Sequence, residues 1–262
     1  MGLYTPYDIK ALILDMDGVL WREDQPIGDL PGIFSRMQSR GWKVTLATNN
    51  ATLSVKQYLK KLQGFGVSLS GEQIVNSSQA VAQYLSQHYP SGGNVYVIGE
   101  IGLIQTLSEC NFHHSEENVL AVIVAMDRHL TYEKLRRGTL LVRSGAPLIG
   151  TNPDRTFPTP EGLAPGAGAI LAALETATSV QAVIVGKPSP EMYKVAIKRM
   201  KTSPTSTLVV GDRLETDIAG GQKLGCPTGL VLSGVTGLEA AQAWKPAPDW
   251  IAPDLTALLD RL

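Results

Sequence analysis

The sequence has little cysteine and almost no net charge, and both shortages narrow its possible functions. Its 262 residues include only two cysteines, Cys110 and Cys226, and no C-x-x-C motif. This content excludes a disulfide framework, and nothing in the sequence places a base beside either thiol. The formal net charge is −1, and no run of lysine or arginine occurs. We therefore expect no nucleic-acid partner.

Long apolar runs and targeting signals are lacking as well. No apolar stretch approaches the roughly 20 residues that a membrane-spanning helix needs. The N-terminus shows no basic segment followed by an apolar one, as a secretory signal would. We expect a cytoplasmic protein with no membrane partner. The four histidines show no metal-ligand spacing and are interpreted as surface residues: His88, His113, His114 and His129.

Short apolar runs that alternate with amphipathic stretches are the main feature of the sequence. With 44% hydrophobic and 18% charged residues, the chain has the composition of an ordinary globular protein. The alternation favours an α/β fold with a mainly parallel sheet. Strands of the main sheet are predicted at 9–14, 44–47, 182–185, 207–210 and 229–232, because these runs lack polar alternation. Helices are predicted at 30–40, 54–63, 189–200 and 215–224.

A second set of elements lies in the middle of the chain. Strands are predicted at 94–98, 119–125 and 148–150, with helices at 102–110, 131–143 and 166–176. This pattern indicates a second α/β unit inserted into the first. We expect a core made of residues 1–78 and 180–262 and an inserted domain made of residues 79–179. The Pro- and Gly-rich stretch 152–168 is interpreted as a long loop.

Two aspartates one residue apart follow the first apolar run, in the segment Asp15-Met16-Asp17-Gly18-Val19-Leu20. Successive residues of a strand point to opposite faces, so Asp15 and Asp17 would share a side if the strand continued. Neighbouring carboxylates repel each other unless a cation or a proton lies between them. The pair suggests a magnesium ion beside a carboxylate nucleophile, which is a known chemistry for aspartate. The alternative is a solvated strand end with a turn.

Three more polar signals follow apolar runs. Thr48-Asn49-Asn50 comes after the second strand, Gly186-Lys187-Pro188 after 182–185, and Gly211-Asp212-Arg213 after 207–210, with Asp217 five residues beyond Asp212. In open α/β sheets, ligands bind at the carboxyl ends of the strands. A hydroxyl, a lysine and several carboxylates at one edge predict a phosphoryl-transfer site.

These four segments resemble the four motifs of the haloacid dehalogenase superfamily, in order. The gap from Asp15 to Thr48 is 33 residues and the gap from Thr48 to Lys187 is 139, which leaves room for a domain only in the second. An α/β cap in that position resembles the NagD-like, 4-nitrophenyl phosphatase branch. The phrases at 186–190, 211–218, 127–132 and 151–154 are similar to that branch too. The resemblance implies a Rossmann-like parallel-sheet core with an inserted α/β cap domain.

The resemblance also implies a role for each motif residue. Asp15 would be the nucleophile that forms an aspartyl-phosphate. Asp17 would act as general acid and then as general base, which is worth roughly 10²–10⁴ in rate. Thr48 would bind a phosphoryl oxygen, and Lys187 would neutralise charge on Asp15 and on the phosphoryl group. Asn49 and Asn50 are candidate donors to the substrate, with ordinary turn chemistry as the alternative.

The expected cofactor is Mg²⁺, which prefers oxygen ligands and keeps several waters. Its ligands would be Asp15, Asp212 and the backbone carbonyl of Asp17. Asp217 is expected in the second shell of the metal, orienting a water or Lys187. The alternative for Asp217 is an acidic residue at a helix N-terminus, where the helix dipole favours it. Asn152, Asp154 and Arg155 are weaker candidates in the cap, with loop hydrogen bonding as the alternative.

These observations favour a magnesium-dependent phosphomonoesterase that hydrolyses a small phosphorylated metabolite. Two other hypotheses stay open. One is a phosphotransferase or mutase of the same superfamily. The other is a non-catalytic protein that binds a phosphorylated metabolite, although every catalytic position is filled. A homodimer formed through the cap is a further expectation, because related caps often mediate dimers.

Overall fold

The computed structural model describes residues 7–50, 53–159 and 162–262. The chain divides into two compact units, each with its own sheet and helices. Unit 1 contains residues 1–48, 55–75 and 193–262. Unit 2 contains residues 49–54 and 76–192. Each unit is an α/β assembly of the kind that the alternating apolar and amphipathic runs predict.

Unit 1 is built on a six-stranded sheet in the order β15-β14-β13-β1-β4-β5. The strand pairs β15–β14, β14–β13, β13–β1 and β1–β4 are parallel. The central strand β1 is fully buried, which explains its unbroken apolar sequence. The strands are β1 (Ala11–Leu14), β4 (Lys43–Thr48), β5 (Ile74–Asn76), β13 (Thr207–Gly211), β14 (Thr228–Val231) and β15 (Trp250–Ala252).

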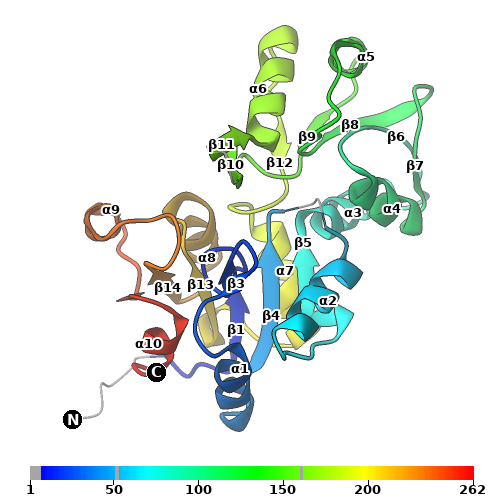
Figure 1. The fold of residues 1–262 in the computed structure, drawn as a ribbon. Coiled ribbons are helices and arrows are strands. Elements are labelled where there is room, and N and C mark those ends of the chain that lie inside the picture. The colour runs from blue at the N-terminus through cyan, green and yellow to red at the C-terminus, as the bar shows by residue number, and fades with distance from the viewer. Residues whose placement is uncertain (1–6, 51–52, 160–161) are drawn as a thin grey trace. The chain divides into compact units, whose positions relative to one another are not determined.

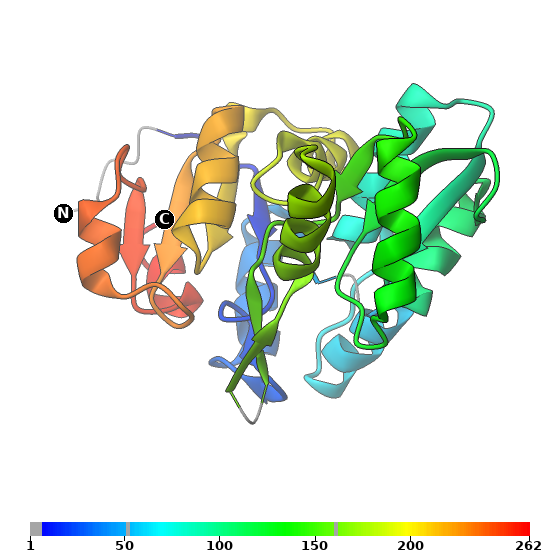
Figure 2. The ribbon, with the colours of Figure 1, turned by 90° about the horizontal axis from the view of Figure 1, so that it is seen from above.

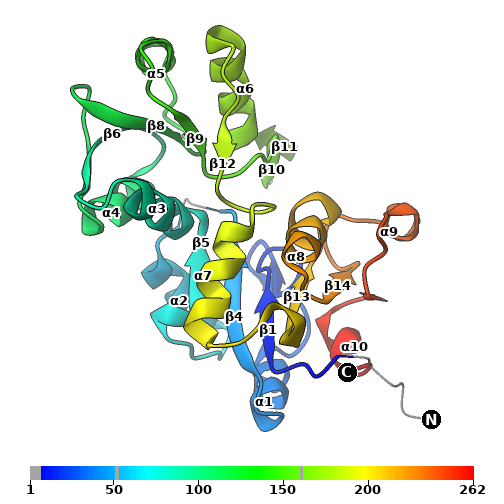
Figure 3. The same cartoon turned by 180° about the vertical axis from the view of Figure 1, so that it is seen from behind.

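Helices cover both faces of this sheet. Figure 3 shows α7 and α8 on the face turned toward the viewer, while α1, α2 and α10 lie on the other face, toward the viewer of Figure 1. The helices are α1 (Leu30–Ser39), α2 (Val55–Gly64), α7 (Pro190–Met200), α8 (Ala219–Leu224), α9 (Leu238–Ala243) and α10 (Leu255–Leu259). Shorter elements are the ribbon β2 (Trp21–Arg22) and β3 (Gln25–Pro26), the 3-10 turns η1 (Gly71–Gln73) and η2 (Pro204–Ser206), and the π turn η3 (Leu214–Ile218).

Local sequence signals explain where these helices begin. The side chain of Asp29 accepts a hydrogen bond from the Gly32 amide at 3.2 Å, and Pro31 lies in the first turn of α1. Asp254 caps α10 in the same way, accepting from the Ala257 amide at 2.8 Å. Helix α1 then buries Leu30, Ile33 and Met37, whose spacing places them on the face toward the sheet.

Unit 2 has a five-stranded sheet in the order β12-β9-β8-β6-β7, and its four strand pairs are parallel. Its helices α5 and α6 lie side by side on one face, with α3 and α4 on the other (Figures 1 and 2). The strands are β6 (Gly93–Ile98), β7 (Phe112–His114), β8 (Val119–Val124), β9 (Leu148–Gly150) and β12 (Val183–Ile184), and the helices are α3 (Ser77–His88), α4 (Ile101–Glu109), α5 (Tyr132–Arg143) and α6 (Ala167–Thr178). Val122, Val124 and Leu174 are among the core residues between this sheet and α5 and α6.

The structure corrects the prediction that strand 182–185 belongs to the main sheet. Strand β12 pairs with β9 in the sheet of unit 2, where it forms an edge with Val183 43% exposed. The segment β9–α6–β12 is a crossover between neighbouring parallel strands, which is the usual short connection. The units therefore differ from the predicted segments 1–78, 79–179 and 180–262: residues 49–54 and 180–192 group with unit 2, and position 78 lies inside α3.

The predicted long loop at 152–168 is also wrong for most of its length. It contains the antiparallel hairpin of β10 (Thr156–Thr159) and β11 (Gly162–Pro165) and the start of α6. Pro158 lies inside β10 and Pro165 ends β11, and these residues concealed the hairpin because proline is a poor strand residue except at edges. Among the helices in the described ranges, none combines the length and the apolar character that crossing a bilayer requires.

Candidate active site

The carboxyl ends of three adjacent strands in unit 1 meet at one edge of the sheet. Leu14, the last residue of β1, is in register with Leu46 of β4 on one side and Val210 of β13 on the other. The Asp15 amide continues this ladder by donating to the Val210 carbonyl at 2.9 Å. The next residues along each strand therefore come together, and these include Asp15, Thr48 and Asp212.

Three carboxylates converge at this edge. One oxygen each of Asp15, Asp212 and Asp217 lies within 4.8 Å of the other two. Asp212 and Asp217 are 2% and 1% exposed, and Asp15 is half-buried. Three negative charges this close, with little water around them, repel one another strongly unless a cation or protons lie among them.

Backbone amides fix two of these carboxylates in place. Asp212 Oδ2 accepts from the Val235 amide at 2.7 Å, and its backbone carbonyl accepts from Thr236 at 3.2 Å. Asp217 Oδ2 accepts from the Arg213 amide at 3.1 Å. The π turn η3 carries Asp217 back beneath Gly211 at the end of β13. Both side chains are thus oriented by hydrogen bonds from the main chain, so the fold itself fixes the geometry of the cluster.

Two glycines make room for the cluster. A Cβ at Gly18, which has a φ of +83°, would lie 2.5 Å from Asp212 Oδ2. A Cβ at Gly234 would collide with the same carboxylate. The turn after β1 and the loop after β14 therefore approach Asp212 more closely than any other residue type allows. Ser233 joins the two segments, because its hydroxyl donates to the Gly18 carbonyl at 2.7 Å.

The donor set of this cluster fits a hard divalent cation. All three side chains offer carboxylate oxygens, which are the ligands that Mg²⁺ prefers, and Asp15 is exposed enough for waters to complete an octahedron. The side-chain cluster contains Asp217, which we predicted in the second shell. Within the described residues, it does not contain the Asp17 carboxylate.

Asp17 occupies a different position from Asp15. Its side chain is exposed, and its Oδ1 accepts from the indole Nε1 of Trp21 at 2.8 Å. Trp21 itself is only 1% exposed, so it belongs to the core. The structure thus separates the two aspartates, placing Asp15 in the acidic cluster and Asp17 on a neighbouring indole. Thr48, the last residue of β4, is 2% exposed.

The remaining motif residues, Asn49, Asn50 and Lys187, belong to unit 2. The side-chain amide of Asn49 joins two segments there, accepting from the Lys187 amide at 2.8 Å and donating to the Lys187 carbonyl at 3.0 Å. Lys187 is 3% exposed, and Asn50 is exposed. The Asn49 side chain is therefore committed to holding the backbone of the lysine loop.

Two of the weaker cap candidates, Asn152 and Asp154, bind to Asn49. Asn152 Nδ2 donates to the Asn49 carbonyl at 2.9 Å, and Asp154 Oδ2 accepts from Asn49 Nδ2 at 3.3 Å. A Cβ at Gly186 would collide with the Thr151 carbonyl, so the segments at 49, 151–154 and 186–187 are packed closely. Arg155 is exposed. Sequence reasoning left loop hydrogen bonding as the alternative for this group, and Asn152 and Asp154 do make such bonds.

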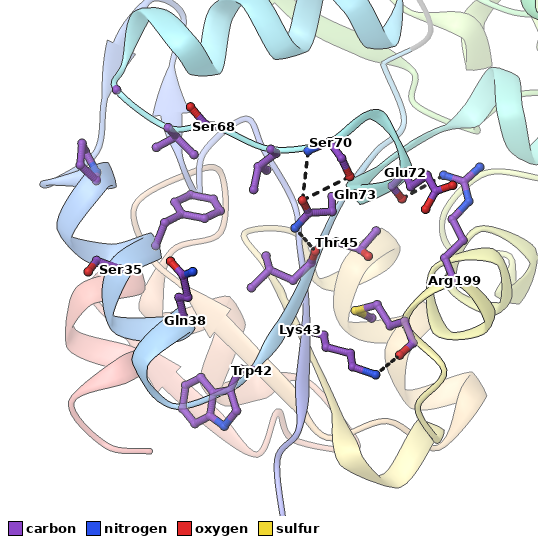
Figure 4. A pocket seen from close by; sticks show the side chains of 17 residues that line it. Ser35, Gln38, Trp42, Lys43, Thr45, Ser68, Ser70, Glu72, Gln73 and Arg199 are labelled. Atoms are coloured by element: carbon purple, nitrogen blue, oxygen red, sulfur yellow. Dashed lines mark hydrogen bonds between the residues drawn. The ribbon is translucent and has the colours of Figure 1, made fainter.

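A cavity of about 600 Å³ lies at the opposite end of β4 (Figure 4). Strand β4 has six residues, so its two ends lie about 17 Å apart. The basic groups of this cavity bind backbone carbonyls: Lys43 Nζ donates to Met200 at 2.7 Å, and Arg199 Nη1 to Glu72 at 3.2 Å. Cations at helix C-termini are structurally favourable, so these contacts serve the fold.

Two features of the candidate site in unit 1 were not predicted from the sequence. One is the bond from Trp21 to Asp17, for which the sequence carries no pattern. The other is the loop Ser233–Thr236, whose amides and hydroxyl hold Asp212 and Gly18. The sequence could have indicated this loop, because it follows the carboxyl end of the strand β14, where site residues gather in parallel sheets. Neither cysteine contributes to the site: Cys110 is exposed, and burial raises the pKa of the Cys226 thiol to about 12.

Comparison with known proteins agrees with this arrangement. A family model described as haloacid dehalogenase-like hydrolase matches residues 12–113, and a second, HAD-hydrolase-like model matches residues 184–258. The 5′-nucleotidase YutF of Bacillus subtilis is 36% identical over 230 residues, which cover 88% of this chain and 90% of that protein. The chain belongs to the haloacid dehalogenase-like hydrolases.

Solved structures place this hydrolase more narrowly. The 4-nitrophenylphosphatase of Thermotoga maritima has a TM-score of 0.92 and 30% identity, with 97% of each chain covered. The glycerol phosphate phosphatase of Mycobacterium tuberculosis, in complex with magnesium, has a TM-score of 0.89 and 31% identity, covering 96% of this chain and 76% of that one. The predicted NagD-like, 4-nitrophenyl phosphatase branch is confirmed, and so is the fold class.

Proposed function

We propose that this hydrolase is a magnesium-dependent phosphomonoesterase acting on a small phosphorylated metabolite through an aspartyl-phosphate on Asp15. The observation that carries the proposal is the convergence of Asp15, Asp212 and Asp217 at the carboxyl edge of a parallel sheet. That edge is where ligands bind in open α/β sheets. The names of the relatives, a 5′-nucleotidase and two phosphatases, support the same class of reaction.

Residues of this chain act in both steps of the proposed reaction. In the first, an oxygen of Asp15 attacks phosphorus, the bond from phosphorus to the ester oxygen breaks, and Asp17 gives its proton to that oxygen. In the second, Asp17 takes a proton from water as the water oxygen attacks phosphorus, and the bond to Asp15 breaks. The buried hydroxyl of Thr48 is the expected donor to a phosphoryl oxygen.

A bound magnesium ion, held by Asp15, Asp212 and the Asp17 carbonyl, would neutralise charge on the phosphoryl group and on the carboxylates. Asp217 would orient the water and carboxylate ligands from beneath. The role of Lys187, which is to neutralise Asp15 and the phosphoryl oxygens, rests on the family motif. Asn49 would act through Lys187, because its side chain bonds both polar groups of the lysine backbone.

The test is phosphate release from a panel of monoesters, including 4-nitrophenyl phosphate, glycerol phosphate and nucleoside monophosphates, with magnesium and with chelator. We expect magnesium-dependent release, and the ranking of esters would indicate the substrate. Lys187→Met should lower release without changing magnesium binding, since no metal ligand is lost. Phosphate that moves to added glycerol instead of water would indicate a phosphotransferase. A folded protein that releases phosphate from no ester would contradict the proposal and favour a binding protein.

A further inference from the structure

The exposed carboxylate of Asp17 is held by a buried tryptophan. The indole Nε1 of Trp21 lies 2.8 Å from Asp17 Oδ1, and the chain between the two residues closes with a bond from the Gly18 amide to the Trp21 carbonyl at 2.7 Å. A free surface aspartate samples several rotamers. Here one oxygen of the carboxylate is directed by a donor that cannot move, so the other oxygen has a defined direction as well.

The indole is itself fixed from outside this turn. Lys61 Nζ lies 4.8 Å from the centre of the Trp21 ring, and the Phe65 ring centre lies 5.8 Å from it. Lys61, on α2, is held in turn by Asp24 at 3.2 Å and by the Glu23 carbonyl at 2.5 Å. Cation–π and aromatic contacts of this kind favour one ring orientation. The donor to Asp17 therefore belongs to a rigid assembly that joins the β2 ribbon to α2.

We propose that Trp21 is a positioning residue that dedicates one oxygen of Asp17 to proton transfer, an inference that rests on the proposed phosphatase function. An indole N–H is a donor only, so Asp17 Oδ1 can only accept from it. The unprotonated oxygen of a carboxyl group is the better acceptor, so the bond to Oδ1 favours a proton on Oδ2. The bond leaves Oδ2 to give that proton to the departing ester oxygen, and later to take one from the attacking water.

The inference predicts a dependence on the leaving group that a merely structural role would not produce. An alkoxide needs a proton as it departs, whereas 4-nitrophenolate is a weak base and leaves without one. Trp21→Phe removes the N–H and keeps an aromatic ring. General acid catalysis is worth roughly 10²–10⁴ in rate, and misdirecting the acid loses part of that. We expect kcat/KM for glycerol phosphate to fall about tenfold or more relative to kcat/KM for 4-nitrophenyl phosphate.

A matched control is the same substitution at Trp42. That residue is half-buried at the amino end of β4 and stacks on Arg40, whose guanidinium carbon lies 4.7 Å from the ring centre. Trp42→Phe should lower kcat/KM for both esters by the same factor or leave both unchanged. Should Trp21→Phe fail to fold, 3-benzothienylalanine at position 21 keeps the shape of indole and replaces the N–H with sulfur. The magnesium-dependent rise in Tm reports that the acidic cluster is intact in each variant.

The possible outcomes distinguish the positioning role of Trp21 from the proposed phosphatase function. A selective loss with glycerol phosphate supports the positioning role of Trp21. Equal losses with both esters, or no loss with either, in a folded variant that still responds to magnesium, would overturn it while leaving the phosphatase function in place. A wild-type protein that hydrolyses neither ester would overturn the proposed function itself.

Discussion

Each unit has a parallel sheet, and the acidic residues at the carboxyl edges of the two sheets are arranged differently. In unit 1, three carboxylates of the same sign converge within 4.8 Å. In unit 2, the acidic residues that follow β6 and β8 are each paired with a base. Asp127 accepts from Lys134 Nζ at 2.7 Å, and both oxygens of Glu100 accept from Arg128 at 2.7 Å. The acidic residues thus form one cluster at the first edge and separate ion pairs at the second.

This difference indicates which edge is suited to a metal ion. A carboxylate that is paired with one base has its charge balanced by that base, whereas three carboxylates within reach of one another can share a single divalent cation. Clusters of this kind are typical of sites that bind metal or perform chemistry. The position of a strand end in a parallel sheet is therefore not enough to identify a site. The close spacing of several carboxylates is what distinguishes the two edges.

We expect the greatest loss of activity in Asp15→Asn. Loss of the proposed nucleophile should lower kcat by about 10³-fold or more, because no other group can form the acyl-phosphate. Phosphate release measures this effect, and thermal unfolding shows whether the variant is folded. Asp8→Asn, at an exposed aspartate whose side chain is 83% accessible, is the control and should not change kcat. Full activity of Asp15→Asn would refute the mechanism.

Magnesium should stabilise the folded protein by binding to the acidic cluster of unit 1. A ligand that binds only the folded state at a hundred times its Kd raises the free energy of unfolding by about 2.7 kcal/mol. We expect a rise of this order in wild type, measured by chemical unfolding with magnesium and with chelator. Asp212→Asn should lose most of it, because a carboxamide is a neutral and weaker ligand. A rise that survives in Asp212→Asn would place the ion elsewhere.

Asp127→Asn tests the ion pair with Lys134 at the carboxyl edge of the unit 2 sheet. The Asp127 side chain is 1% exposed, so its bond to Lys134 is shielded from water. Hydrogen bonds to charged groups contribute roughly 1.5–3 kcal/mol, and we expect a loss of about 2 kcal/mol in the free energy of unfolding. Glu133→Gln, on the helix α5 that carries Lys134, breaks an exposed pair with Arg136 and serves as the control, with no measurable loss. If the two variants lose equal stability, the Asp127 pair has no special value.

The sequence predicted the longer strands and missed several of the short ones. The strands at 11–14, 43–48, 93–98 and 119–124 were found because each contains a run of mostly apolar residues. The three-residue strands β5, β7 and β15 carry too few residues for any periodicity to show, although the equally short β9 was predicted at its observed bounds. β12 was found but assigned to the wrong sheet, since a two-residue strand contains no information about its neighbour.

The candidate site divides in the same way. The meeting of Asp15 with Asp212 could be predicted, because the carboxyl ends of parallel strands share an edge. The sequence predicted Asp217 near the metal but not inside the carboxylate cluster, because that position depends on the π turn η3 that brings residue 217 back under Gly211. The bond from Trp21 to Asp17 depends on the ribbon β2–β3 and on α2, which are tertiary features. Local signals thus located the charges, while their orientation came from packing.

Glu100 should make only a small contribution to the free energy of unfolding, and this contribution depends on pH. Hydrogen bonding to Arg128 holds the pKa of the Glu100 carboxyl below its ordinary value of 4.5. A lowered pKa in the folded state stabilises the protein above the unfolded value, and this contribution disappears as the pH falls through the folded value. Because Arg128 is 64% exposed, solvent screens the pair, and we expect less than about 1 kcal/mol.

The difference in unfolding free energy between wild type and Glu100→Gln should therefore be largest near about pH 6 and shrink toward about pH 3. A difference that stays constant between these two pH values would show that the bond from Arg128 to Glu100 contributes nothing to stability.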